Sequence, residues 1–231
     1  MKTLLNNIDL NEALFDNSNI GFVPTMGSLH DGHISLIKKS LKLSNKTIVS
    51  IFVNPKQFNN KEDYKKYPRN IKKDLSTLRK LNVDYLFLPK NEHIYNYSKK
   101  SKFYLNKKEK ILCAKFRKGH FEGVLDVMNR LTKLIKPKKI FMGKKDFQQL
   151  FLVKNFIENK FNTKVIGCKT IRNRNKLALS SRNFLLKGNE LNDVEKISKN
   201  FLNLKNKIKY TKNINQFLQK TKKDFERFFN I

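Results

Sequence analysis

Short apolar runs that alternate with helix-like segments constrain the fold of this chain more than any other feature of its sequence. The runs are rich in β-branched and aromatic residues and predict buried strands, while the segments between them have helical spacing. Because neighbouring parallel strands need crossover connections, the alternation predicts an α/β fold with a Rossmann-like, doubly wound parallel sheet. The predicted strands cover residues 20–23, 47–53, 85–88, 139–142 and 164–166, and the predicted helices 34–43, 71–81, 122–135 and 147–160.

The pattern changes near residue 183, after which only helical periodicity remains. Two helices are predicted there, over 185–208 and 214–229, separated by a short polar turn. No long Gly/Ser/Pro linker separates them from the preceding segment. We therefore expect a first domain over residues 1–182 and a small, mainly helical domain over 183–231.

The net charge of +31 on 231 residues makes nucleic acid the first partner to consider. The lysines are spread through nearly every segment rather than gathered on one face, so we expect only non-specific attraction to polyanions. No apolar run is long enough to span a bilayer and no secretory signal opens the chain, which predicts a cytoplasmic protein without membrane contact. Cys113 and Cys168 stand far apart and predict free, partly buried thiols.

Glycine and histidine are scarce in this chain, and they cluster. Three of the histidines, His30, His33 and His120, fall in segments that follow strands or open helices. In an open parallel sheet these segments project at the carboxyl ends of the strands, where ligands bind. The clustering therefore predicts a ligand site at that edge.

The segment 22–33 ends a strand, turns through glycines and is predicted to start a helix at His33. Helix amides favour phosphate, Gly32 allows close backbone approach, and the imidazoles of His30 and His33 can stabilise charge on a phosphate under attack. The alternative is a loop in which a histidine satisfies only backbone groups.

Three later segments add polar groups at the same edge. Asn54 and Gln57 suit hydroxyl and carboxylate recognition, although an Asn-Pro pair is also typical of a plain turn. In segment 143–149 a lysine can neutralise phosphates, with Asp146 near ribose or metal and Gln149 one turn further on. Two hydroxyls and an arginine in 180–182 predict a phosphate-binding site, or alternatively a helix cap.

Six segments together resemble the pantothenate synthetases, members of the H-x-G-H nucleotidyltransferase superfamily. They are PTMGSLHDGH, SIFVNPKQF, YPR, RKGHFEGV, GKKDFQQL and LALSSRN, in the family's order and at about its spacing. The resemblance covers about residues 21–183. It implies an AMP-forming ligase that activates pantoate with ATP as an acyl-adenylate and then transfers it to β-alanine, with Mg²⁺ accompanying ATP and a homodimeric assembly.

The resemblance also implies roles for individual residues. His33 would be the catalytic histidine, with His30, Lys145 and Arg182 offsetting negative charge in the first step. Gln57 and Gln149 would bind pantoate and β-alanine, and no Mg²⁺ ligand is identified. The implied ATP-binding residues are Met26, Gly27, Ser28, Leu29, His30, Asp31, Gly32, His33, Gly143, Lys144, Lys145, Asp146, Ile171, Leu179, Ser180, Ser181 and Arg182.

The chain departs from the family pattern in three places. Lys144 stands where the family usually has Glu, and Lys118 where it usually has Pro. The family's C-terminal domain is typically longer and includes a small antiparallel sheet that closes over the site. Two other functions stay open: a related nucleotidyltransferase acting on a different acid, and a nucleic-acid-binding protein that has lost the activity.

Overall fold

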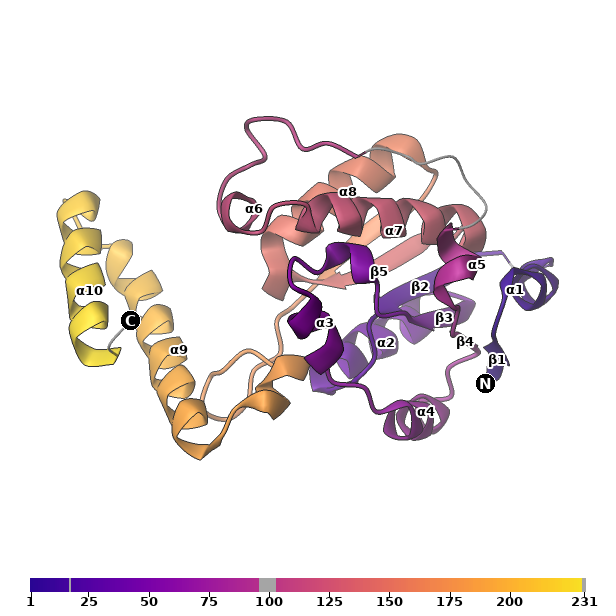
Figure 1. Cartoon of the computed structure of the whole chain (residues 1–231), viewed down its shortest axis with the longest axis horizontal. Helices are drawn as coiled ribbons and strands as arrows, with labels where there is room; N and C mark the ends of the chain where they lie inside the picture. The colour runs from indigo at the N-terminus through magenta and orange to yellow at the C-terminus, as the bar shows by residue number, and fades with distance from the viewer. Residues whose placement is uncertain (17, 96–102, 230–231) are drawn as a thin grey trace. The chain divides into compact units, whose positions relative to one another are not determined.

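The computed structural model describes residues 1–16, 18–95 and 103–229, and its contacts divide the chain into two compact units (Figure 1). The first unit is Met1–Thr170 and the second is Ile171–Ile231. The expected boundary at residue 182 therefore falls inside the second unit. Each unit is described by itself.

The first unit is built on a six-stranded sheet in the order β1-β4-β3-β2-β5-β6, and all the pairings are parallel. The predicted α/β class and parallel sheet are confirmed. β1 was not predicted, because only Leu4 of its three residues is buried and so short a run carries no periodic signal. The strands are β1 Lys2–Leu4, β2 Ile20–Thr25, β3 Lys46–Ile51, β4 Tyr85–Phe87, β5 Lys139–Gly143 and β6 Lys164–Cys168.

Helices cover both faces of this sheet, with α7 and α8 on one face and α2 and α4 on the other (Figure 1). Neighbouring residues of one strand enter different cores: Phe22 packs with α7 and α8, and Val23 packs with α2 and α4. Strands buried on both faces read as continuous apolar runs, which is why the sequence revealed them. The helices are α1 Asn7–Leu14, α2 Asp31–Leu43, α4 Ile71–Lys80, α7 His120–Ile135 and α8 Phe147–Lys160.

The strand order reverses between β2 and β5. From β2 the chain adds β3 and then β4 on one side, and later adds β5 and β6 on the other. Such a reversal leaves a crevice at the carboxyl ends of the two central strands. The β2–α2 turn and η2 (Lys144–Asp146), which follows β5, both start at this crevice.

Several short helical elements at the same end of the sheet were not predicted, because one or two turns leave little periodicity. They include η1, which carries Gln57, and α3, which precedes α4. Their bounds are η1 Pro55–Gln57, α3 Lys61–Lys66, α5 Asn91–Tyr95 and α6 Cys113–Phe116.

The second unit contains η3 (Ser181–Leu185), α9 (Gly188–Ile208) and α10 (Ile214–Phe229). α9 begins later than expected because η3 takes the preceding residues. The carboxylate of Glu195 in α9 accepts hydrogen bonds from the side chains of Asn173 and Asn175, both at 2.6 Å, and so fastens α9 to the loop before it. Within this unit the described antiparallel pairing is a single bridge, Arg172 with Ala178.

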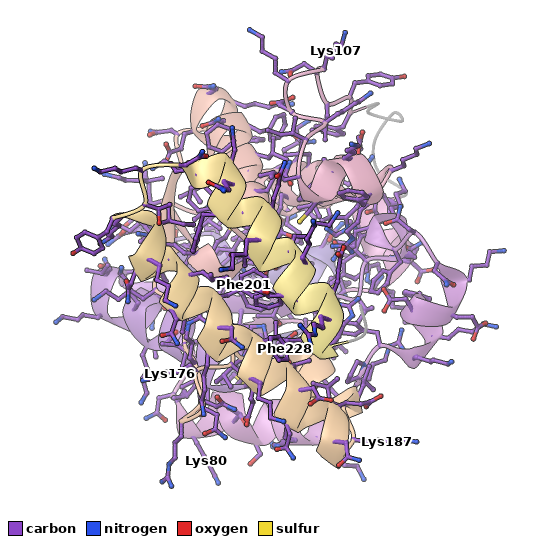
Figure 2. The ribbon with its side chains drawn as sticks, turned by 90° about the vertical axis from the view of Figure 1, so that its left-hand side faces the viewer. Lys80, Lys107, Lys176, Lys187, Phe201 and Phe228 are labelled. Atoms are coloured by element: carbon purple, nitrogen blue, oxygen red, sulfur yellow. The ribbon has the colours of Figure 1, made fainter. Side chains whose placement is uncertain are left out.

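Lysine side chains project from both units, as Lys80, Lys107, Lys176 and Lys187 show in Figure 2. This agrees with the dispersed charge of the sequence. Cys168 is buried, whereas Cys113 is exposed, so the prediction of partial burial was wrong for Cys113. None of the described helices combines the length and the apolar character needed to cross a membrane.

Candidate active site

The turn between β2 and α2 has a constrained backbone. Gly27 and Ser28 both have positive φ, +77° and +51°. That conformation is uncommon for a residue with a side chain, so Ser28 must be held there by its surroundings. Asp74 of α4 supplies a restraint, because its carboxylate accepts the backbone N–H of Ser28 at 2.8 Å and that of Leu29 at 2.7 Å.

His30 and His33 lie together at the start of α2, with ring centroids 4.1 Å apart. His30 is the N-cap, and its Nδ1 accepts the Gly32 N–H at 3.1 Å. His33 reaches back, and its Nδ1 accepts the His30 N–H at 3.3 Å. The helix therefore begins at Asp31 and not at His33 as predicted, because two imidazoles form the cap.

The same geometry explains the glycine between the histidines. A Cβ on Gly32 would lie 2.6 Å from Cε1 of His30, so the imidazole packs against the bare backbone. Gly32 was predicted to leave this space for the close approach of a ligand. The imidazoles also occupy the His30 and Gly32 amides, two of the donors expected to face phosphate. These two amides are therefore hydrogen-bonded within the cap, whereas the sequence predicted that they face phosphate.

The cap fixes the protonation of both rings. Since each Nδ1 accepts a hydrogen bond, each neutral ring carries its proton on Nε2 and can donate from that atom. Burial, His30 and Lys145 lower the pKa of His33 to about 3. Burial and the positive charge of Lys145 also lower the pKa of His30, against an opposing effect of Asp31. At neutral pH both histidines are therefore uncharged donors.

Lys144 and Lys145 follow β5 and face different groups. Lys145 acts electrostatically on both histidines, and its Nζ lies 3.8 Å from Oδ1 of Asp146. The side chain of Lys144 lies over Gly167 of β6, and its charge acts on Cys168. Of the two predicted lysines, Lys145 is the one whose charge reaches the histidines.

Gln57 and Asn54 form a hydrogen-bonded pair at the carboxyl end of β3. The side chain of Asn54 donates to Oε1 of Gln57 at 3.2 Å, and Nε2 of Gln57 donates to Sδ of Met26 at 2.8 Å. Asn54 is 1% exposed, and its Oδ1 accepts the hydroxyl of Tyr95 at 2.7 Å. The Asn-Pro pair is thus a turn, as the plain alternative held, and it also orients Gln57 and links it to the β2–α2 turn.

Residues of α7 hold the backbone of η1. Nδ1 of His120 lies 2.6 Å from the carbonyl oxygen of Gln57, to which it donates. A Cβ on Gly123 would clash with the carbonyl of Lys56. This close approach places Gln57 against α7, and it gives His120 and Gly123 a structural role.

Replacing Gly123 with Ala should force η1 away from α7. We expect a loss of about 1–3 kcal/mol of stability, typical of overpacking, and a higher KM for the substrate that Gln57 binds. Thermal unfolding and steady-state kinetics would measure both. Gly188→Ala is the control, because a Cβ there meets nothing within 4 Å. Equal effects of the two substitutions would contradict the steric argument.

The two glutamines of the GKKDFQQL segment have different surroundings. The side chain of Gln148 donates to the carbonyls of Glu109 and Ile111, at 3.2 and 2.8 Å, and accepts the N–H of Ala114 at 3.3 Å. Gln148 therefore ties down the loop before α6. Gln149, half-buried in the first turn of α8, stays the predicted substrate ligand of the pair.

The remaining predicted residues belong to the second unit. The N–H of Leu179 donates to the carbonyl of Ile171 at 3.0 Å, which brings these two together. Oγ of Ser180 accepts the N–H of Arg182 at 3.3 Å and caps η3. Ser180 thus has the capping role considered as an alternative, while Ser181 is buried and Arg182 is exposed.

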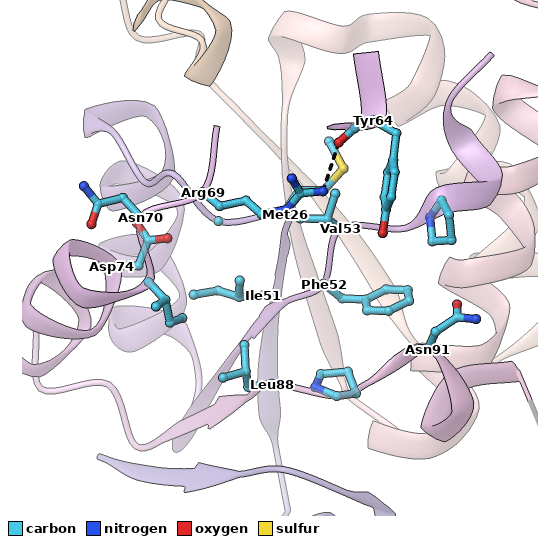
Figure 3. A pocket seen from close by; sticks show the side chains of 14 residues that line it. Met26, Ile51, Phe52, Val53, Tyr64, Arg69, Asn70, Asp74, Leu88 and Asn91 are labelled. Atoms are coloured by element: carbon cyan, nitrogen blue, oxygen red, sulfur yellow. Dashed lines mark hydrogen bonds between the residues drawn. The ribbon is translucent and has the colours of Figure 1, made fainter. Parts of the chain in front are cut away.

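A cavity of about 320 Å³ lies beside Met26 and Gly27 (Figure 3). Ile51, Phe52 and Val53, at the end of β3, form part of its apolar wall. The α3–α4 segment contributes a polar rim of Tyr64, Arg69, Asn70 and Asp74. This cavity places the α3–α4 segment next to the β2–α2 turn.

A family model described as pantoate-beta-alanine ligase matches residues 3–230 of this chain. The pantothenate synthetase of Flavobacterium psychrophilum is 43% identical over 220 residues, covering 94% of this chain and 78% of that protein. The pantothenate synthetase of Francisella tularensis subsp. mediasiatica is 42% identical over 221 residues, covering 91% of this chain and 85% of that protein.

Solved structures give the same result. A Francisella tularensis pantoate-beta-alanine ligase, crystallised with beta-gamma ATP and beta-alanine, superposes with a TM-score of 0.83 at 40% identity, over 86% of this chain and 78% of that one. The pantothenate synthetase of Thermus thermophilus gives a TM-score of 0.82 at 35% identity, over 86% of this chain and 72% of that one.

Proposed function

The chain belongs to the pantoate-β-alanine ligase family, and we propose that it joins pantoate to β-alanine with ATP through a pantoyl-adenylate. The observation that carries the mechanism is the pair of neutral imidazoles beside Lys145, at the crevice where the strand order reverses. Such a group of donors suits the stabilisation of negative charge on a phosphate.

In the first step a carboxylate oxygen of pantoate attacks the α-phosphorus of ATP. A bond forms between the carboxylate oxygen and the α-phosphorus. The bond from the α-phosphorus to the oxygen that bridges it to the β-phosphorus breaks, and pyrophosphate leaves with the electron pair. His30 and His33 would donate from Nε2 to the phosphate oxygens, and Lys145 would offset the charge that moves to pyrophosphate. Gln57, oriented by Asn54, and Gln149 would hold pantoate in line.

In the second step the neutral amine of β-alanine attacks the carbonyl carbon of the adenylate. The C–N bond forms, the C–O bond to AMP breaks, and the proton that the amine loses passes to the released AMP phosphate or to solvent. Arg182, Ile171 and residues 179–181 are proposed to contact the nucleotide, as the family resemblance implies. A homodimeric state and a cytoplasmic location also stay predictions, and light scattering of the purified chain would test the first.

Mg²⁺ is proposed to enter with ATP. Among the residues that the structure describes, no group of three or more His, Cys, Asp or Glu side chains could hold a metal. We therefore propose that the phosphates of ATP carry most of the ion's coordination, since Mg²⁺ commonly keeps waters and takes about one or two carboxylates from the protein. Asp146, exposed beside Lys145, is the side chain we propose for this contact. The ion would neutralise phosphate charge.

An assay with ATP, Mg²⁺, pantoate and β-alanine, omitting each in turn, tests this function. Pyrophosphate release should require pantoate, and AMP and pantothenate should form together only when β-alanine is present. ATP–pyrophosphate exchange that does not depend on pantoate would instead favour a related nucleotidyltransferase acting on another acid. Absence of turnover with tight, salt-sensitive RNA binding would favour the nucleic-acid alternative.

A further inference from the structure

We propose that Asp74 is a positioning residue for the adenylation step, acting through the turn that carries the catalytic histidines. The residue is 2% exposed, and its two carboxylate oxygens accept separate backbone amides of that turn. Figure 3 shows Asp74 on α4, at the edge of the cavity that Met26 also lines. This inference rests on the proposed function, since it concerns the same site.

The position of Asp74 suits a negatively charged side chain. It lies in the first turn of α4, where Asn70 is the N-cap, so the positive end of the helix dipole stabilises its charge. Hydrogen bonds from amides to a carboxylate are short and stronger than neutral ones. The distances of 2.8 Å to Ser28 and 2.7 Å to Leu29 fit such bonds.

The restraint is needed because of the backbone that it holds. Ser28 has φ of +51°, a conformation that costs on the order of 1 kcal/mol or more for a residue with a side chain. Leu29 directly precedes His30, the N-cap whose ring touches His33. Loss of the two bonds would let the turn relax, and both imidazoles would lose their fixed direction.

Asp74 also determines which groups can meet phosphate. The Ser28 and Leu29 amides are committed to the carboxylate, and those of His30 and Gly32 are committed to imidazole nitrogens. The donors left to contact phosphate at the start of α2 therefore include the two Nε2–H groups. A small displacement of reacting groups can cost about 100-fold in rate.

Asp74→Asn is the test, because Asn keeps the volume but can accept only one of the two amides well. We expect a folded protein whose kcat for pantoate-dependent pyrophosphate release falls about 10- to 100-fold. The KM for pantoate should change less than about threefold, since Asn54 orients Gln57, and Gln57 meets the turn at Met26, ahead of the two amides that Asp74 holds. In ¹⁵N spectra the Nε2–H form of His30 and His33 should give way to mixed tautomers.

Asp84→Asn is the matched control. Asp84 also accepts a backbone amide and a second donor, the Thr47 N–H at 2.8 Å and Nζ of Lys46 at 2.9 Å, but at the amino ends of β3 and β4. It should lose comparable thermal stability and keep kcat within about twofold. Equal losses of kcat in the two variants, or a folded Asp74→Asn with wild-type kcat, would overturn the proposal.

Two measurements on the unaltered chain keep the proposal testable if Asp74→Asn does not fold. The Ser28 and Leu29 amides should exchange slowly with deuterium, and His30 and His33 should both be Nε2–H tautomers. Rapid exchange of both amides would contradict the two hydrogen bonds to Asp74. These readouts do not need turnover, so a chain that fails the pantoate assay yet protects both amides would refute the proposed function alone.

Discussion

Substitution of His33 by Ala should lower the rate of pantoyl-adenylate formation by about 100- to 1000-fold, the usual effect of removing a preorganised donor to a developing anion. The ring of His33 accepts the His30 amide through Nδ1, so its Nε2–H is aimed and ready to donate. Its loss removes one donor and also frees His30. Pantoate-dependent pyrophosphate release measured in a single turnover would report the effect.

His93→Ala provides the control, because His93 also accepts a backbone N–H from three residues earlier but has no proposed role in adenylation. Its Nδ1 accepts the N–H of Lys90, three residues before it, at 3.2 Å. Loss of that cap should cost stability and leave adenylation within about twofold of wild type. Near-normal pyrophosphate release in His33→Ala would refute the role of His33.

The low pKa of His33 makes a separate prediction about pH. Its folded-state pKa of about 3 lies below the ordinary value of 6.5, so the unfolded chain binds the proton more readily. The stability that neutral His33 contributes is therefore fully present above pH 6.5 and is lost as pH falls from 6.5 towards 3. Melting temperatures across this range should decline less in His33→Ala than in the wild type, and parallel declines would argue against a half-buried ring that stays neutral.

The sequence predicted those strands of the sheet that are buried on both faces. Phe22 and Val23, or Ile140 and Phe141, form continuous apolar runs because neighbouring side chains enter different cores. β1 and the one-turn helices escaped prediction because their stability comes from contacts with distant elements. The pairing of Lys2 with Tyr85 illustrates this, since nothing local to either residue indicates it.

The sequence predicted the candidate residues that belong to a recognisable motif, such as His30 and His33. It did not predict Asp74, which contacts the site through backbone amides. Asp74 shares a helical face with Ile71, Leu75 and Leu78, so an acidic residue on an apolar face was the available signal. The two imidazoles were predicted as ligand contacts, but not as caps of the same helix. That role depends on ring positions that spacing alone does not fix.

Lys145→Ala should lower the rate of adenylate formation by about 100-fold, because a cation beside the leaving pyrophosphate stabilises charge that is greatest in the transition state. The same substitution should raise the pKa of both His30 and His33, since the charge of Lys145 lowers them. NMR titration of the histidines would measure this shift independently of turnover.

Lys144→Ala is the comparison that separates the effect of the position of Lys145 from the effect of the chain's overall positive charge. Lys144 carries the same charge one residue earlier, but its side chain lies over Gly167 and acts on Cys168. We expect its kcat to fall less than about tenfold and the pKa values of the two histidines to stay unchanged. If both alanine variants lost activity equally and neither moved a histidine, the site would respond only to the general positive potential of a +31 chain, and the specific role of Lys145 would be wrong.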